Sequence, residues 1–407
     1  LSEPAVLVGL IALIGLIAQK KPVTECIKGT VKTIMGFVIL GAGAGLVVSS
    51  LGDFANIFQH AFGIQGVVPN NEAIVSVAQK SFGKEMAMIM FFAMVINIMI
   101  ARFTPWKFIF LTGHHTLFMS MMVAVILATA GMTGVTLIAV GSLVVGVAMV
   151  FFPAIAHPYM KKVTGSDDVA IGHFSTLSYV LAGFIGSKFG NKEHSTEDMN
   201  VPKSLLFLRD TPVAISFTMS IIFLVTCLFA GADAVKELSG GKNWFMFSIM
   251  QSITFAAGVY IILQGVRMVI AEIVPAFKGI SDKLVPNARP ALDCPVVFPY
   301  APNAVLVGFL SSFAAGLIGM FTLYLLNMIV IIPGVVPHFF VGAAAGVFGN
   351  ATGGRRGAIL GAFAQGLLIT FLPVFLLPVL GDIGFANTTF SDADFGALGI
   401  LLGIIVR

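Results

Sequence analysis

The sequence predicts an all-α protein that crosses a lipid bilayer many times. Hydrophobic residues make up 57% of the 407 residues and charged residues only 10%, and the mean hydropathy is +0.99. Apolar stretches close to the roughly 20 residues that a spanning helix needs recur along nearly the whole chain. Short turns with Gly, Pro or charged residues separate them. A chain of this composition is solvated by a membrane rather than by water.

Each predicted helix is an apolar run between two such breakers. The first run is slightly short for a full span, so we expect the chain to start inside its first helix, without a cleavable signal peptide. A further, interrupted helix is expected between 328 and 348, which makes about ten or eleven spans. The other predicted helices are 5–19, 30–51, 86–100, 118–130, 135–156, 211–232, 244–270, 304–328, 358–380 and 395–406.

Basic residues gather in some of the turns, and these turns should face the cytoplasm. The turn 131–134 carries no charge, the turn 233–242 is mixed, and the turn before the last helix holds Asp382, Asp392 and Asp394 without a base. We expect these three turns outside and the C-terminus in the cytoplasm. The basic residues expected on the cytoplasmic side are Lys20, Lys21, Lys28, Lys32, Arg102, Lys107, Lys161, Lys162, Lys188, Lys192, Lys203, Lys278, Lys283, Arg289, Arg355 and Arg356.

Two segments do not fit a simple count of helices. The segment 171–190 is polar at one end, and the segment 337–354 is dense in Gly, Ala and Asn. Such segments are typical of re-entrant hairpins, which lie at membrane depth only where protein or a water-filled cavity covers them. Broken segments at similar places in two halves point to the midplane site of a transporter. The tripeptide Val-Pro-Asn occurs at 68–70 and again at 285–287, and we interpret this as a trace of an inverted repeat.

Ionisable residues inside a membrane are costly and therefore mark function. His114 and His115 follow a basic turn, His173 opens the first predicted hairpin, and Asp293 lies in a Pro-broken apolar segment. Imidazole and carboxylate groups at such breaks suit a polyhydroxylated ligand. Alternatively, the two adjacent histidines lie in a capping turn and His173 is a satisfied core residue. Asp293 would then pair with Arg289 or cap the helix that starts at Asn303.

The run Gln-Gly-Val-Arg at 264–267 ends a long predicted span and is followed by Glu272. Arg267 and Glu272 are five residues apart, which is off the ideal helical spacing for a pair. We interpret them as a structural ion pair at the cytoplasmic end of the helix.

The sequence carries no signature of catalysis. It has no Walker-type nucleotide loop, no His/Cys/Asp cluster with metal-ligand spacing and no local Ser/His/Asp signature. We therefore expect no catalytic residue, no metal and no cofactor. Cys26, Cys227 and Cys294 are widely spaced and are predicted to be small core residues. The formal net charge of +4 is dispersed without a basic stripe, so no nucleic-acid partner is expected.

Several of these segments together resemble a known family, the L-ascorbate-type permeases (enzyme IIC) of the bacterial phosphoenolpyruvate-dependent sugar phosphotransferase system. The resemblance covers nearly the whole chain. It rests on residues 28–37 (KGTVKTIMGF), 111–114 (LTGH), 171–173 (IGH), 264–268 (QGVRM) and 293–304 (DCPVVFPYAPNA).

The resemblance implies a multi-pass protein of the bacterial inner membrane that forms a homodimer. Dimerising scaffold helices would come from residues 1–52 and 204–274. A mobile core would come from residues 53–203, with a hairpin near 171–190, and from residues 275–407, with a hairpin near 337–354. The core would carry its ligand across the membrane in a rigid-body, elevator-like movement while the scaffold remains in place.

The resemblance also implies where the substrate is bound. Members of the family carry Thr-Tyr where this chain has Asn71-Glu72, and amide side chains where it has Phe118 and Phe174, so selectivity within the family is open. The implied substrate contacts are Asn71, Glu72, His114, His115, Thr116, Leu117, Phe118, His173, Phe174 and Asp293.

The implied function is group translocation of L-ascorbate with the soluble partners enzyme IIA and phosphorylated enzyme IIB. Phospho-enzyme IIB would donate the phosphoryl group, and this chain would position the substrate. One alternative is an ion-coupled secondary transporter in which Glu272 or Asp293 carries a proton or Na⁺. Another is a phosphotransferase permease for a different sugar acid or a polyol such as galactitol. A membrane-embedded enzyme is the least supported class.

Overall fold

The computed structural model describes residues 4–63, 66–199, 204, 207–208, 210–381 and 388–406. It is almost entirely helical, and seven of its described helices are long and apolar enough to cross a membrane. The prediction of an all-α polytopic membrane protein is therefore confirmed. Two further helices, α4 (Gly113–Thr129) and α12 (Ala393–Val406), are apolar but shorter than a span.

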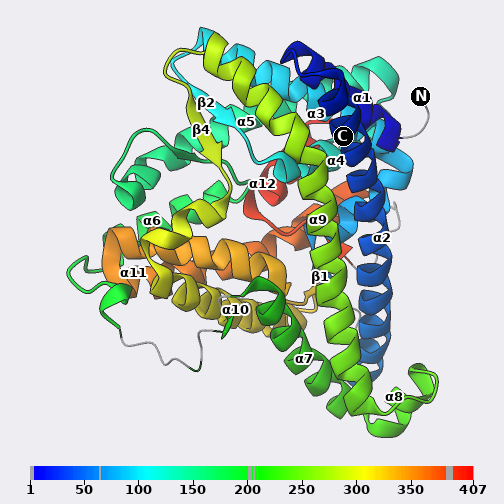
Figure 1. Cartoon of the computed structure of the whole chain (residues 1–407). Coiled ribbons are helices and arrows are strands. Elements are labelled where there is room, and N and C mark those ends of the chain that lie inside the picture. Colours follow the sequence, from blue (N-terminus) through cyan, green and yellow to red (C-terminus); the bar gives the residue numbers. More distant parts are fainter. Residues whose placement is uncertain are drawn as a thin grey trace.

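The chain consists of two halves with a similar order of elements, with α8 and η3 as additions in the second half. Figure 1 shows the arrangement of the helices. The first half contains α1 (Pro4–Ala18), α2 (Val23–Phe62), β1 (Gly66–Pro69), α3 (Asn71–Phe103), β2 (Phe108–Phe110), α4, α5 (Gly134–Thr164), β3 (Ala170–Ile171), α6 (Thr176–Phe189) and η1 (Thr196–Asp198). The second half contains α7 (Thr211–Ala230), α8 (Ala232–Leu238), α9 (Trp244–Leu284), β4 (Arg289–Leu292), η3 (Cys294–Tyr300), α10 (Pro302–Leu325), β5 (Val330–Ile331), α11 (Val335–Leu380), β6 (Thr388–Thr389) and α12.

Helix α11 explains how the halves correspond. Its backbone leaves the helical conformation at Gly353 and Gly354, and Gly354 has a φ of 60°. A Cβ on Gly349 would lie 2.2 Å from the carbonyl oxygen of Gly357, so the two arms of α11 fold back on each other there. These arms correspond to α4 and α5 in the first half. The element order thus supports a repeat of the two halves. The Val-Pro-Asn tripeptides do not mark equivalent positions, because 68–70 lies at the end of β1 and 285–287 lies before β4.

Two three-stranded parallel sheets interlock the halves. One has the strand order β5-β1-β6, and the other has the order β2-β4-β3. In each sheet the central strand comes from one half and its two neighbours come from the other. Strands of two to four residues pair only across the chain, which is why hydrophobic periodicity did not predict them.

The second predicted hairpin differs from the structure. Residues 337–352 form one continuous helical arm, and the chain reverses only at its end, at Gly353 and Gly354. The segment 171–190 does contain a strand end, a bend and the helix α6. Its counterpart in the repeat is 388–406, where β6 leads into α12, a helix of 14 residues like α6. The Gly-rich composition of 337–354 instead serves close helix packing.

Helices α6 and α12 start side by side and lead to different ends of the protein. The backbone N–H of Ala393 donates to Ser175 Oγ at their common start. Helix α6 ends beside Gly353, whereas Gly403 of α12 lies against Val379, close to the contact of Thr129 Oγ1 with the Leu380 carbonyl. The C-terminal end of α12 is therefore on the same side as the turn 131–134. The sequence predicted that this turn lies outside and that the C-terminus lies in the cytoplasm. These two predictions cannot both be correct, because the structure puts both on one side.

Glycines allow α10 and α11 to pack closely, and this packing provides a test of the fold. A Cβ on Gly308 would lie 2.3 Å from the carbonyl oxygen of Gly342, whereas a Cβ on Gly52 of α2 would meet no atom within 4 Å. We expect Gly308→Ala to lower the unfolding free energy by about 1–3 kcal/mol through overpacking. We expect Gly52→Ala to raise it by about 0.4–1 kcal/mol. Thermal unfolding of both variants in detergent measures the difference, and equal melting temperatures would contradict the close packing.

Candidate substrate-binding site

The site is built where strands end and helices begin. Each of the six described strands runs into the N-terminus of a helix after a few residues, and polar side chains occupy these junctions. Helix N-termini present free N–H groups and a positive dipole end, which suit anionic or hydroxyl oxygens. The polar residues at the junctions are Asn71 and Glu72 after β1, His114 and His115 after β2, His173 after β3, Asp293 after β4, and Ser391 and Asp392 after β6.

These junctions enclose a cavity of about 240 Å³. Its walls come from both halves of the chain, so the inverted repeat brings together groups that are up to about 320 residues apart, such as Ser391 and Asn71, whose backbone N–H and Oδ1 form a 2.9 Å hydrogen bond. Seven of the ten predicted contact residues line the cavity: Asn71, Glu72, His114, His115, Phe118, His173 and Asp293.

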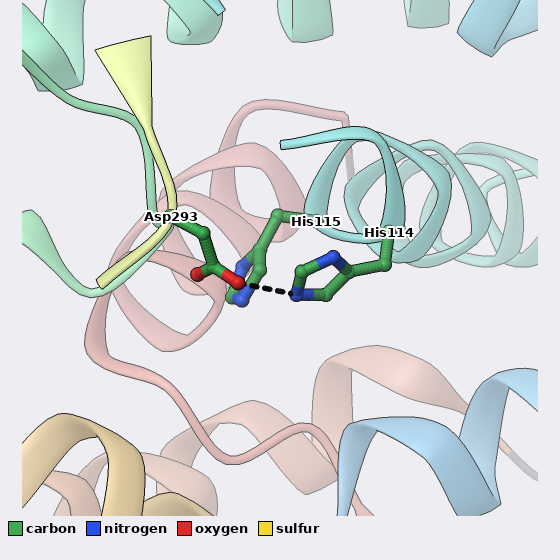
Figure 2. Close-up of side chains that lie close together, drawn as sticks. All are labelled: His114, His115 and Asp293. Carbon is green, nitrogen blue, oxygen red and sulfur yellow. Dashed lines mark ion pairs between the residues drawn. The ribbon is translucent and has the colours of Figure 1, made fainter. Parts of the chain in front are cut away.

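His114 and Asp293 face each other across this cavity (Figure 2). The Nε2 atom of His114 lies 3.5 Å from Oδ2 of Asp293, and both side chains are partly accessible. Asp293 also caps η3, because its Oδ1 accepts the backbone N–H of Cys294 at 2.7 Å. The predicted cap on the helix from Asn303 is wrong, because the backbone N–H groups of Asn303 and Ala304 donate to the Glu197 carboxylate instead. Oδ2 of Asp293 is directed at the cavity.

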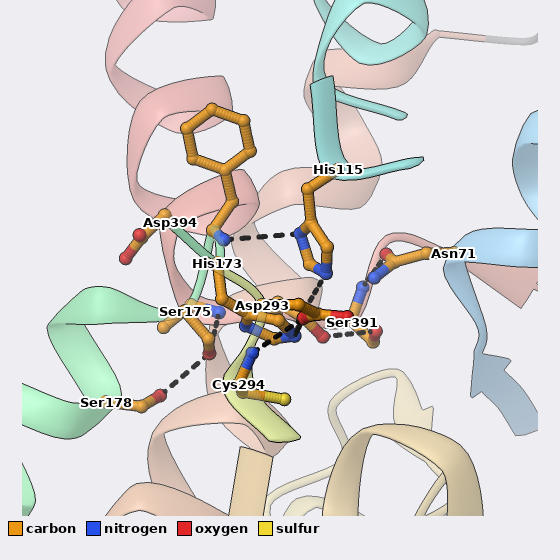
Figure 3. A network of polar contacts seen from close by, with 12 residues as sticks. Asn71, His115, His173, Ser175, Ser178, Asp293, Cys294, Ser391 and Asp394 are labelled. Carbon is orange, nitrogen blue, oxygen red and sulfur yellow. Dashed lines mark hydrogen bonds and ion pairs between the residues drawn. The ribbon is translucent and has the colours of Figure 1, made fainter. Parts of the chain in front are cut away.

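His115 and His173 form a buried imidazole pair with ring centroids 3.8 Å apart (Figure 3). The backbone N–H of Phe174 donates to Nδ1 of His115, so the proton of the neutral His115 ring resides on Nε2. Nε2 of His173 lies 3.8 Å from Asp293 and 3.9 Å from Asp392, and two carboxylates favour a proton there as well. Tyr179 then donates its hydroxyl to Nδ1 of His173 at 2.8 Å. Both rings thus present N–H donors.

The distances in this cluster are too long for direct hydrogen bonds. His115 Nε2 lies 3.9 Å from Oδ2 of Asp392, the same distance as His173 Nε2. Hydrogen bonds of this type measure about 2.7–3.2 Å. A hydroxyl placed among the three side chains could accept from an imidazole and donate to the carboxylate. The arrangement therefore fits a hydroxylated ligand.

The same three residues have the composition of a metal site, with two imidazoles and one carboxylate whose ligand atoms lie within 4.8 Å of one another. The tautomer of His115 argues against that use. Its Nδ1 lone pair is occupied by the Phe174 N–H, and its Nε2 carries the proton rather than a free lone pair. His115 is therefore a hydrogen-bond donor, and the prediction that no metal is bound stays a prediction.

Glu72 is the least satisfied acid of the site. Its side chain is 6% exposed, and its Oε2 has no hydrogen-bond partner among the described atoms. Buried polar atoms in proteins are nearly always hydrogen-bonded, and an orphaned one marks a functional position. Its position in the cavity wall makes Glu72 available to a hydroxyl donor of a ligand.

Three of the predicted contact residues do not line the cavity. Thr116 is fully buried, with its hydroxyl directed at the Thr112 carbonyl, and Leu117 is buried beside it on α4. Phe174 is also fully buried and stacks on Phe110 with ring centroids 4.6 Å apart. Phe174 contributes through its backbone, which fixes the His115 ring.

Sequence reasoning missed Ser391 and Asp392, and it placed Asp392 and Asp394 in an external turn. That placement is wrong, because Asp392 is 4% exposed and Asp394 is fully buried. Asp394 accepts the backbone N–H groups of Thr176 and Leu177 and thereby caps α6 from the opposite half. Counting bases per turn could not reveal this. The shared dipeptide Phe-Ser at 174–175 and 390–391, shortly before α6 and α12, was the available signal. Asp382 lies outside the described residues.

Arg289 does not pair with Asp293. It binds Asp167, donating Nε to the Asp167 carbonyl at 3.0 Å and a second guanidinium N–H to the Asp167 carboxylate. Asp167 also contacts Lys161 at 2.5 Å and His157 at 2.8 Å. This loop cluster connects the approach to β3 with β4, the strands that lead to His173 and Asp293. The side chain of Glu272 lies outside the described set, so its predicted pairing with Arg267 stays a prediction.

A cavity formed by paired helix N-termini and unwound backbone at the centre of an inverted repeat defines the class of protein as a membrane transporter. Comparison with known proteins gives the family. Residues 1–394 match the family model of the PTS system sugar-specific permease component, and the chain belongs to this family. The resemblance to this family is thus confirmed over nearly the full sequence.

One curated relative is named the ascorbate-specific PTS system EIIC component of Mycoplasma pneumoniae (strain ATCC 29342 / M129 / Subtype 1). The sequences are 27% identical over an alignment of 453 positions, gaps included, and this alignment covers 97% of this chain. The chain spans 66% of that relative's own length.

The Asp167 cluster predicts a specific dependence of stability on pH. Lys161, His157 and Arg289 hold the pKa of the Asp167 carboxyl well below its usual range. A lowered pKa in the folded state stabilises the protein above the unfolded value of about 3.9, and this contribution is lost as the pH falls toward the lowered pKa. We expect Asp167→Asn to lower the melting temperature by a constant amount between about pH 5 and 8 and by less below about pH 4. Asp168→Asn is the matched control, and a pH-independent deficit would contradict the ion-pair cluster.

Proposed function

We propose that this permease binds L-ascorbate or a closely similar sugar acid and carries it across the membrane for phosphorylation by phospho-enzyme IIB. The observation that carries the proposal is the cavity in which imidazole N–H donors face carboxylates across gaps of 3.5–3.9 Å. A ligand hydroxyl that lies beside such a pair, on the cavity side, can accept from the imidazole and donate to the carboxylate. The printed name of the Mycoplasma relative supports ascorbate as the first substrate to test.

Ascorbate is an anion with several hydroxyls, and both features have partners in the cavity. The N-termini of α3, α4, α6 and η3 and the N–H donors of His115 and His173 suit its enolate oxygen. Asp293 and Asp392 suit its hydroxyls as acceptors. The permease thus contributes orientation, and the phosphoryl donor is on enzyme IIB, which enzyme IIA recharges.

A neutral polyol is the second candidate, and Glu72 favours it. The cavity holds the three acids Glu72, Asp293 and Asp392, and Oε2 of Glu72 is unpaired among the described atoms. A third carboxylate disfavours an anionic ligand and favours one with an additional hydroxyl. The comparison of ascorbate with galactitol therefore decides the substrate class.

The transport movement that we propose has α1, α2, α7 and α9 as a dimerising scaffold and the remaining elements as the mobile core, as the resemblance implies. Support comes from the packing of α2 along α9 and of α6 and α10 on α11 (Figure 1). Within the scaffold, Ser50 Oγ donates to the Gln251 carbonyl and the Gln251 side-chain amide donates to Asp53. Crosslinking between copies through α2 would support a dimer, and an exclusively monomeric protein in both detergent and lipid would contradict it.

Binding of radiolabelled L-ascorbate to the purified protein tests the site. We expect Asp293→Asn and His173→Ala each to weaken binding by about 10- to 100-fold, because each removes a hydrogen bond that involves a charged or buried partner. Asp168→Asn, an exposed acid outside the cavity, should bind as the wild type does. Unlabelled galactitol, gluconate and D-isoascorbate serve as competitors. Unchanged affinity in both site variants would contradict the proposed site, and displacement by galactitol alone would favour the polyol.

The energy source separates group translocation from ion-coupled transport. In proteoliposomes, we expect substrate to accumulate as its phosphate ester only when phosphorylated enzyme IIB is present. A proton gradient alone should drive no uptake. Uptake of unmodified substrate that follows the proton or Na⁺ gradient would instead assign the protein to the ion-coupled class.

A further inference from the structure

A second, larger cavity of about 540 Å³ adjoins the substrate cavity. It lies between the helices α7 and α9 on one side and η3, α10 and α11 on the other. Four residues line both cavities: Leu263, Arg267, Pro295 and Phe340. We call this second cavity the vestibule. The two cavities therefore adjoin at these four residues, which places the vestibule beside a bound substrate.

One wall of the vestibule is polar and belongs to a single helix. Tyr260, Gln264 and Arg267 follow one another on α9 at spacings of four and three residues, so they share one helix face. The opposite wall is apolar and includes Phe298 and Phe339. Arg267 is the member of the polar face that also reaches the substrate cavity.

Arg267 stands out by its charge. Among the described residues that line the two cavities it is the only Lys or Arg, whereas the carboxylates are Glu72, Asp210, Asp293 and Asp392. A phosphoryl group carries about −1.5 to −2 charges at neutral pH and would be repelled by these acids. The planar guanidinium of arginine binds phosphoryl oxygens with two parallel hydrogen bonds.

We propose that Arg267 contacts the phosphoryl group during its transfer to the substrate and retains the phosphorylated product until release. This inference rests on the proposed function. In the step, a substrate hydroxyl oxygen forms a bond to phosphorus while the bond between phosphorus and the phosphorylated side chain of enzyme IIB breaks. The electron pair of the broken bond stays on the donor side chain, and the hydroxyl proton moves to a carboxylate of the cavity. Arg267 balances the charge on the phosphoryl oxygens throughout.

The experiment compares Arg267→Gln, Arg267→Lys and the matched control Arg356→Gln, whose side chain is exposed on α11 and lines neither of these two cavities. The purified full chain is assayed for binding of L-[¹⁴C]ascorbate, or of galactitol if that is the substrate. It is also assayed for binding of the phosphorylated product isolated from the wild-type reaction, and for phosphoryl transfer from phospho-enzyme IIB in proteoliposomes.

We expect Arg267→Gln to lower kcat for transfer by about 100-fold, as loss of one transition-state donor does elsewhere. It should weaken binding of the phosphorylated product by about 10-fold more than binding of the unphosphorylated substrate, with Arg267→Lys intermediate. Equal weakening for substrate and product would overturn the inference, since Arg267 would then be a substrate or structural residue. Unchanged transfer would also overturn it. A wild type that binds substrate but accepts no phosphoryl group from enzyme IIB would overturn the proposed function itself.

Discussion

The arrangement of this protein depends on one constraint, that backbone N–H and C=O groups at membrane depth must be hydrogen-bonded within the protein. A transporter site of unwound segments exposes several such groups at once. Here the two parallel sheets pair them, because each central strand from one half is flanked by two strands from the other. Neither half can satisfy its own broken segments, so the interlocking of the repeats is a condition for having a site at all.

The same exchange between halves extends from backbone to side chains. Asp394 in the second half caps α6 in the first half, and Ser391 donates its N–H to Asn71 across the same boundary. These bonds hold helix N-termini at fixed positions around the cavity, and they leave the Nε2 atoms of His115 and His173 as donors. A structural cap and a cavity-lining acid thus lie two residues apart, at Asp394 and Asp392. A preorganised site of this kind loses little entropy when it binds a ligand.

Much of this could be predicted from the sequence, and the omissions have physical reasons. Long apolar runs predict helices because burial in lipid dominates their energetics. Histidines at Gly-containing breaks predict a binding site because ionisable side chains inside a membrane are energetically costly and are retained mainly for function. Asp392 and Asp394 were misplaced because a rule that counts charges assumes that a turn faces water. The predicted hairpin at 337–354 was displaced along the chain, since the reversal occurs only at Gly353 and Gly354 and the preceding glycines serve helix packing. The two-residue strands depend on partners far along the chain, which no local pattern encodes.

This chain departs from the family pattern at Asn71, Glu72, Phe118 and Phe174, and the structure shows that these four side chains differ in their access to the cavity. Phe174 lies outside the cavity wall, stacked on Phe110, and Oδ1 of Asn71 already accepts the N–H of Ser391. Phe174 is therefore withdrawn from the ligand, whereas Asn71 still lines the cavity. Glu72 and Phe118 both line the cavity, and Phe118 packs its ring edge-on to His114 with centroids 5.8 Å apart. Compared with the tyrosine and amide of the family pattern, these two residues remove one hydroxyl and one amide and add a carboxylate and an apolar ring. Any difference in substrate that these departures cause therefore arises at the three of them that line the cavity, Asn71, Glu72 and Phe118.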